Sequence, residues 1–411
     1  MLARVVTDDR SNPNSRSSGT LNLSAVIAVL FISVAIYMVA RYRRGVLPTG
    51  ICAVWLFVWT GIALNTSGAS GETLREGVRE ASVLAIGVLI YNAREAIGVP
   101  TATRLVQLVG FFPAVLALYQ LATHTGLYVA HNVRANGTFA HPNSAAMFFA
   151  IATTISLWRY MDDGRNRLDC LLSALFAAAL VATFSIDGMI TLAAMLIVLG
   201  ALHPGLTRIR LIPWGAAILV VVVFIATPLG SKRVAGESAT NLSAAERGET
   251  TSTLDTRLYR WRTLLPQWEE SPVWGRGLGT TTTSTNTRAN RLNSLLPHNE
   301  YIRYLVETGV LGVLILIAGL STLIRTLLRG RRLDGLPGAR GFNASSLAIA
   351  VIIGCLVNSL ADNTLLNSPT GYALAIVLGA VLSSGGEPRR QRLPETANDP
   401  FLGGEIARAP A

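Results

Sequence analysis

The stretch of the chain best suited to chemistry runs from Pro297 to Val313. It opens with the polar residues His298, Asn299 and Glu300 and leads directly into an apolar run. Histidine ionises close to neutral pH, so His298 is a candidate general base, and Asn299 is a candidate N-cap of a helix that begins here. We therefore expect His298 at the rim of a membrane span, within reach of an aqueous acceptor and a lipid-borne donor. The alternative is a capping or interfacial histidine without chemistry.

The polar residues that follow recur at helical spacing. Asn299, Arg303 and Glu307 fall at positions i, i+4 and i+8, which predicts one polar stripe at the water boundary. Either Glu300 or Glu307 would orient the imidazole ring for proton transfer. The predicted catalytic residues are therefore His298, Glu300 and Glu307, and Asn299 and Arg303 are further site candidates.

Arginines in the longest polar stretch of the chain, residues 230–299, are candidates for binding phosphate. Arg257, Arg260 and Trp261 would share one face of a helix, and Leu264 would continue that face. Guanidinium groups bind phosphate oxygens through two hydrogen bonds, which suits a lipid pyrophosphate at a membrane surface. The alternative is an amphipathic helix on the bilayer surface that contacts only headgroups.

A second polar segment, residues 134–144, precedes another apolar run. Arg134 could add a cation to the phosphate site, and His141 and Asn143 are further candidate site residues. The alternative is that His141 and Asn143 only satisfy backbone groups where the next helix begins.

No metal-binding pattern accompanies these residues. The three cysteines have no metal-ligand spacing, and the predicted external segments contain no Asp-x-Asp pair. We expect no metal and no cofactor, so that arginines neutralise the charge that metal ions neutralise in other enzymes.

The elements that must position these residues are membrane helices. The chain is 51% hydrophobic and 14% charged, whereas soluble domains carry about 25% charged residues. Successive apolar runs predict an all-α, polytopic membrane bundle of about 11 to 12 transmembrane helices. The predicted spans are 21–40, 46–65, 81–98, 104–123, 143–160, 168–186, 188–203, 211–229, 301–328, 343–362 and 370–384.

The predicted domain organisation follows from these spans. Residues 1–20 and 385–411 are expected to be disordered tails on either side of one membrane domain, 21–384, with a large external loop at 230–299. The formal charge of +11 comes almost wholly from arginine. Arginine clusters between spans assign their loops to the cytoplasm and leave 134–144 and 230–299 on the outer side. The charge is thus a topological signal, and we expect no nucleic-acid partner.

These motifs resemble the O-antigen ligase and polymerase superfamily of bacterial polysaccharide assembly. The ligases carry a His, then Asn, Ser or Gln, nine residues, Gly, two residues, and Gly, Thr or Tyr, which is matched here by His298, Asn299, Gly309 and Gly312. They also carry an Arg and a Leu separated by three residues in the large external loop, matched by Arg260 and Leu264. The two glycines additionally suit the close approach of a neighbouring helix. The similarity extends over roughly residues 130–320.

The resemblance implies an inverting, metal-independent glycosyltransferase in the bacterial plasma (inner) membrane. Its donor would be a polyprenyl-pyrophosphate-linked glycan, and its acceptor a hydroxyl group of a glycan, a lipid or a protein. Many members carry Ser-Arg in a middle span, where this chain has Ser185, Ile186 and Asp187. Arg134 or an arginine of the external loop would then take the place of that arginine.

Two other classes of protein remain as alternatives. A transporter or flippase of lipid-linked glycans would also use many membrane helices, although the chain shows no internal repeat of the kind typical of transporters. A non-catalytic scaffold is the third possibility. Glycan transfer by the purified protein would distinguish a glycosyltransferase from a transporter and from a scaffold.

Overall fold

The computed structural model describes residues 23–42, 46–67, 71–129, 132–162, 166–202, 211–226, 231, 253–283, 297–334, 343–365 and 367–384. Both tails predicted to be disordered lie outside these ranges, and so does much of the predicted external loop. The described part of that loop comprises 231, 253–283 and 297–299.

The described chain is α-helical, which confirms the predicted all-α class. Every predicted span corresponds to a helix: α2 (Leu23–Tyr42), α3 (Val46–Ser67), α4 (Gly71–Asn92), α5 (Val99–Thr123), α6 (Pro142–Asp162), α7 (Arg167–Ala182), α8 (Ile186–Ala201), α9 (Leu211–Ala226), α14 (Glu300–Asp334), α15 (Ala344–Ser359) and α16 (Ser368–Ser384). The prediction misplaced α4, which begins ten residues before position 81. Its first turns are rich in Glu and Arg, which an apolar span would not contain.

A short β-hairpin was not predicted. Strand β1 (Leu127–Val129) pairs antiparallel with β2 (Asn132–Arg134), so that Leu127 lies opposite Arg134. The hairpin lies at the same end of the bundle as α12 (Thr253–Glu269). Three residues per strand are too few to form an independent sheet, so the hairpin depends on its packing against the helices.

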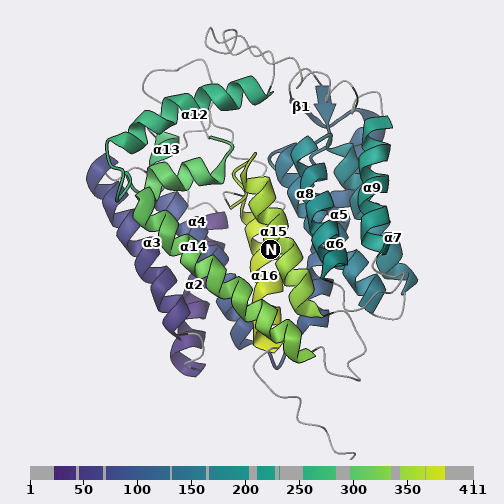
Figure 1. Ribbon diagram of the computed structural model, residues 1–411, viewed down its shortest axis with the longest axis horizontal. Helices are drawn as coiled ribbons and strands as arrows, with labels where there is room; N and C mark the ends of the chain where they lie inside the picture. Colours follow the sequence, from purple (N-terminus) through teal and green to yellow (C-terminus); the bar gives the residue numbers. More distant parts are fainter. Residues whose placement is uncertain are drawn as a thin grey trace, which may run out of the picture.

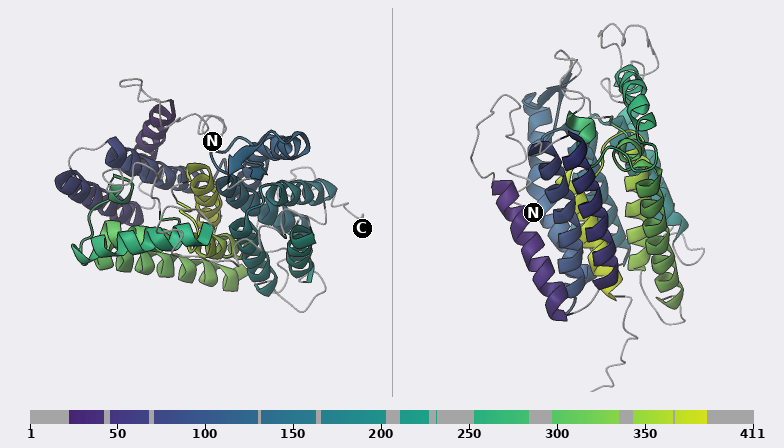
Figure 2. Two further views of the ribbon diagram at one scale, coloured as in Figure 1. Left: turned by 90° about the horizontal axis from the view of Figure 1, so that it is seen from above. Right: turned by 90° about the vertical axis from the view of Figure 1, so that its left-hand side faces the viewer.

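The helices run side by side, and α12 lies across one end of the bundle (Figures 1 and 2). Two helices, Val99–Thr123 and Glu300–Gly330, are long and apolar enough to cross a membrane by length and composition. Six shorter apolar helices of 10 to 17 residues accompany them in the described part of the chain.

The segment that leads into α6 is fixed by a buried aromatic cluster. The ring of Phe139 lies 5.3 Å from that of Phe148 and 5.8 Å from that of Phe149, centroid to centroid, and all three side chains are buried. Gly137, at φ +57°, passes so close to α5 that a Cβ atom there would lie 2.6 Å from the carbonyl oxygen of Pro113. The polar segment 134–144 is therefore held tightly by the core.

Helix α14 is broken at Gly309, where φ is 63° and ψ is −174°. The chain from Pro272 to Gly277 lies in this break. The amide of Gly277 donates to the carbonyl oxygen of Glu307 (2.7 Å), and the amide of Val310 donates to that of Pro272 (2.9 Å). The close neighbour predicted for Gly309 is thus a loop segment and not a helix. Through this contact the chain that follows α12 is attached directly to α14.

The variant Gly309→Ala is expected to destabilise the protein by about 2–4 kcal/mol, because alanine is strained at this φ and must also displace a neighbour. Its Cβ atom would clash with the carbonyl oxygen of Val273. Gly319, on the same helix, is the matched control, because a Cβ atom added there would have no atom within 4 Å. Gly319→Ala should leave the thermal unfolding midpoint in detergent unchanged or slightly raised. Equal midpoints for the two variants would contradict this account of the break.

Candidate functional site

The start of α14 is hydrogen-bonded to the loop between α15 and α16. The side-chain oxygen of Asn299 accepts a hydrogen bond from the amide of Ile302 (3.1 Å), which confirms its predicted role as N-cap. Its side-chain nitrogen donates to the carbonyl oxygen of Leu360 (3.0 Å), and its amide donates to Oδ1 of Asn363 (3.2 Å). The residue just before the cap, His298, has a φ of 47°. This left-handed conformation is therefore held by contacts on its C-terminal side.

His298 is paired with Asp362, a residue that the sequence motifs did not identify. Nδ1 of His298 lies 2.8 Å from Oδ1 of Asp362. A carboxylate can only accept, so Nδ1 carries the hydrogen and Nε2 of the neutral ring is an acceptor. Burial alone would raise the pKa of Asp362, but the hydrogen bond from His298 and the nearby His141 hold this pKa well below its usual value. Asp362 is therefore ionised, and its carboxylate is hydrogen-bonded to Nδ1 of the His298 ring.

The carboxylates predicted to orient His298 lie elsewhere. Glu300 and Glu307 both contact Arg303, at 2.5 and 3.8 Å between charged atoms. Glu307 also accepts a hydrogen bond from the hydroxyl of Thr281, at 2.5 Å, in the short helix α13 (Thr280–Thr283). Asp362, and not Glu300 or Glu307, is thus the carboxylate that orients the imidazole.

Arg303 lies in a buried ionic cluster and not at a water boundary. Its side chain is only 1% exposed, and it contacts Glu76 (2.5 Å) and Glu80 (2.8 Å) of α4. Arg79 pairs with Glu76 in the same cluster. Of the predicted polar stripe of α14, Arg303 is the residue that faces the glutamates of α4. Arg303 and the two glutamates of α14 therefore position the helix start and do not line the site.

Helix α12 brings two arginines to the same region. The guanidinium of Arg257 forms a two-point ion pair with Asp187, at 2.6 and 3.4 Å, at the start of α8. Burial, and then the charge of Arg257, lowers the pKa of Arg260. The indole of Trp261 donates to the carbonyl oxygen of Pro297 (2.6 Å), directly before His298. The predicted shared face of α12 therefore lies against the start of α14.

Arg134 connects the second polar segment to the turn between α7 and α8. Its Nε atom donates to the carbonyl oxygen of Thr183 (2.7 Å), and Nη2 donates to Oδ1 of Asn143 (2.8 Å). The hydroxyl of Ser185 reaches the same Asn143 oxygen at 3.2 Å. The amide of Asn143 in turn donates to Nδ1 of His141 (3.2 Å). Arg134 and Asn143 thus fix the position of the imidazole of His141.

The two histidines belong to one electrostatic cluster. Burial, opposed by the charge of Asp362 and assisted by Arg134, His298 and Arg257, lowers the pKa of His141 to about 4. Segments far apart in the sequence therefore meet at one end of the bundle: the entry to α6, the start of α8, α12, the residues before α14, and the loop after α15. This convergence is the geometry that a single site requires.

Two acidic residues of this cluster were missed, Asp187 and Asp362. The sequence signal for Asp362 is its place at the end of the predicted span 343–362, next to a polar break that the predicted topology puts on the outer side. Asp187 lies two residues after Ser185 in the sequence, and its pairing with Arg257 depends on the fold. Among the residues that the structure describes, no group of three His, Cys, Asp or Glu side chains could hold a metal ion.

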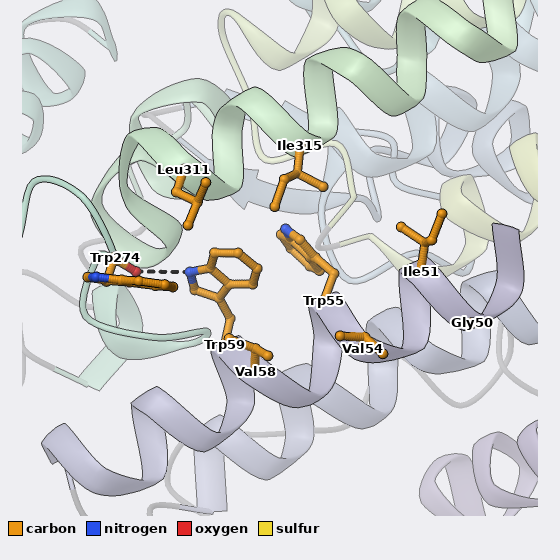
Figure 3. Close-up of a pocket in the computed structure, with 9 residues that line it drawn as sticks. All are labelled: Gly50, Ile51, Val54, Trp55, Val58, Trp59, Trp274, Leu311 and Ile315. Atoms are coloured by element: carbon orange, nitrogen blue, oxygen red, sulfur yellow. Dashed lines mark hydrogen bonds between the residues drawn. The ribbon is translucent and has the colours of Figure 1, made fainter. Parts of the chain in front are cut away.

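An apolar groove of about 620 Å³ lies between α3 and α14 (Figure 3). The part of α14 that lines it follows the break at Gly309 in sequence. The indole Nε1 of Trp59 donates to the carbonyl oxygens of Trp274 (2.9 Å) and Thr308 (3.0 Å), whereas Nε1 of Trp55 is buried without a hydrogen-bond partner among the described residues. The rest of the lining is apolar: Ile51, Val54, Trp55, Val58, Leu311 and Ile315.

The family model described as O-antigen ligase matches residues 171–317. Over this segment the chain is similar to O-antigen ligases. The match confirms the resemblance seen in the motifs, and it indicates a glycan ligase or polymerase of the glycosyltransferase type. Within the matched range lie Asp187, the arginines of α12 and His298, whereas Arg134, His141 and Asp362 lie outside it. No curated protein matches the sequence.

Proposed function

We propose that this protein transfers or polymerises a glycan from a polyprenyl-pyrophosphate donor onto an acceptor hydroxyl at the outer face of the bacterial plasma membrane. The observation that carries the proposal is the pairing of His298 with Asp362, directly after the residue to which Trp261 of α12 donates a hydrogen bond. A base and a group of cations are the two components that displacement of a pyrophosphate by a hydroxyl requires.

The pairing defines the proton transfer. Nε2 of His298 accepts the proton of the acceptor hydroxyl while the acceptor oxygen forms a bond to the anomeric carbon. The bond between this carbon and the phosphate oxygen breaks, and its electron pair leaves with the pyrophosphate. Attack opposite the leaving group inverts the anomeric configuration. The carboxylate of Asp362 stabilises the imidazolium ion that forms.

The arginines hold the leaving group. Arg257 and Arg260 bind the pyrophosphate, and Asp187 keeps the guanidinium of Arg257 in place through its two-point contact. Arg134 adds a positive charge from the side of α6. Because pyrophosphate is already a good leaving group, positioning and charge stabilisation suffice without a metal ion. The groove between α3 and α14 offers an apolar surface to the lipid tail.

Purified protein in liposomes provides the test of this function. Glycan transfer from the polyprenyl-pyrophosphate donor, without added protein partners and in the presence of a chelator, supports the proposal. Translocation of the donor without bond formation would instead identify a flippase. Transfer that stops when the chelator is added would contradict the metal-independent mechanism.

The variant Asp362→Asn is expected to lower the turnover number about 100-fold, at the low end of the contribution of a positioned proton-transfer group. The amide cannot stabilise an imidazolium ion and can present its NH₂ group to Nδ1, which favours the wrong tautomer. The exposed Glu270→Gln is a charge-matched control that should retain full turnover. A turnover number for Asp362→Asn within twofold of the wild-type value would exclude this role.

A further inference from the structure

The tautomers of the two histidines are opposite. His141 accepts a hydrogen bond at Nδ1 from the amide of Asn143, so the hydrogen of its neutral ring is on Nε2. His298 has its hydrogen on Nδ1, where Asp362 accepts it, so its Nε2 is bare. The Nε2 atom of His298 can therefore accept a proton, and the Nε2 atom of His141 can donate a hydrogen bond.

The protein groups around His141 favour its neutral form. Burial and three neighbouring cationic or titratable groups, Arg134, His298 and Arg257, oppose protonation and outweigh the charge of Asp362. With a pKa of about 4, the ring of His141 is neutral near neutral pH. No described residue accepts a hydrogen bond from its Nε2 atom. A neutral imidazole can polarise a substrate oxygen without giving up its proton.

We propose that His141 donates a hydrogen bond from Nε2 to a phosphate oxygen of the glycan donor and stabilises the charge that develops there as the pyrophosphate leaves. This role rests on the proposed function and assigns a second substrate-contacting histidine to it. No bond to His141 forms or breaks, because the electron pair stays on the pyrophosphate and the acceptor proton goes to His298.

The location of His141 favours the donor phosphate over the acceptor hydroxyl. Arg134, a cation assigned to the pyrophosphate, donates to the side chain of Asn143, whose amide donates to His141. The acceptor hydroxyl must instead lie at Nε2 of His298. A neutral donor next to the cations strengthens the binding of a departing anion without adding a further buried charge.

Kinetics of two variants test this role. His141→Ala is expected to lower the turnover number about 10- to 100-fold, the range for one hydrogen bond to a charged group, with little change in the KM for the donor. His141→Gln, whose amide can place an N–H near the original Nε2 position, should recover most of the loss. The pH profile of both variants between about pH 6 and 9 should keep its wild-type shape, because His141 does not titrate there. The exposed His124, at the C-terminus of α5, provides the control His124→Asn, which should be fully active.

Two results would overturn the role of His141. One is a turnover number for His141→Ala within twofold of the wild type. The other is an equal loss in His141→Gln and His141→Ala together with a lowered thermal midpoint, which would make the residue structural. Wild type and His298→Asn are assayed alongside. No transfer by the wild type contradicts the proposed function itself, whereas an active wild type with an inactive His298→Asn and an unaffected His141→Ala contradicts only this inference.

Discussion

Replacing His298 by asparagine is expected to lower the turnover number about 100- to 10,000-fold, the contribution of a positioned general base. Asparagine is the informative substitution because His298 has a φ of 47°, a conformation that asparagine tolerates better than most residues. The variant therefore removes the base without straining the backbone before α14. Turnover in liposomes and the thermal midpoint in detergent are the measurements.

The variant His298→Ala separates the two effects further. It should be as inactive as His298→Asn but somewhat less stable, because alanine is disfavoured at a positive φ by about 1 kcal/mol. Near-normal turnover in either variant would remove His298 from the mechanism. Inactivity accompanied by loss of the folded protein in both variants would show that the histidine is a structural residue.

The variant Arg303→Met is expected to destabilise the protein by about 3–5 kcal/mol, the cost of breaking a buried ion pair from one side. Arg303 contacts Glu76 and Glu80 of α4 as well as Glu300 of its own helix, and its side chain is almost fully buried. Removing the guanidinium leaves these carboxylates without their shared partner. The yield of folded protein and the thermal midpoint should both fall sharply.

Two further variants make the Arg303 prediction specific. Arg303→Lys should recover only part of the stability, because an ammonium group cannot reproduce the planar fork that reaches two glutamates at once. Arg325, exposed on the same helix, provides the control Arg325→Met, which should leave the midpoint nearly unchanged. A stable Arg303→Met protein would contradict the view that the cluster fixes the start of α14.

The order of the helices and the N-cap of α14 could be predicted from the sequence, because both depend on local patterns. Apolar runs indicated the order of the helices, and the cap at Asn299 follows from residue type and position. The shared face of Arg257, Arg260 and Trp261 follows from helical spacing. These features require no knowledge of what lies opposite.

The pairing of charged groups could not be predicted in the same way. Arg303 of α14 and its partners Glu76 and Glu80 of α4 are separated by more than 200 residues, and the polar residues of both helices have the spacing of a solvated helix face. Only the fold shows that Arg303 pairs with these two glutamates. For the same reason Asp362, and not a nearby glutamate, orients His298.

The break in α14 is a further feature that local pattern could not supply. Gly309 fits the family motif and a helix interior equally well in sequence. Its conformation depends on the segment Pro272–Gly277, which replaces the hydrogen bonds lost at the break. A glycine that accommodates a loop and one that accommodates a helix have the same sequence signature.

The most direct test of a shared pyrophosphate site is equilibrium binding of the polyprenyl-pyrophosphate-linked glycan to three purified proteins. His298→Asn should bind the donor as tightly as the wild type, because the base is not needed to hold the pyrophosphate. The double variant Arg257→Gln/Arg260→Gln should bind at least about 10-fold more weakly, since it lacks two charge-assisted contacts. Wild-type affinity in the double variant would show that these arginines do not hold the donor, and the account of the site would be wrong.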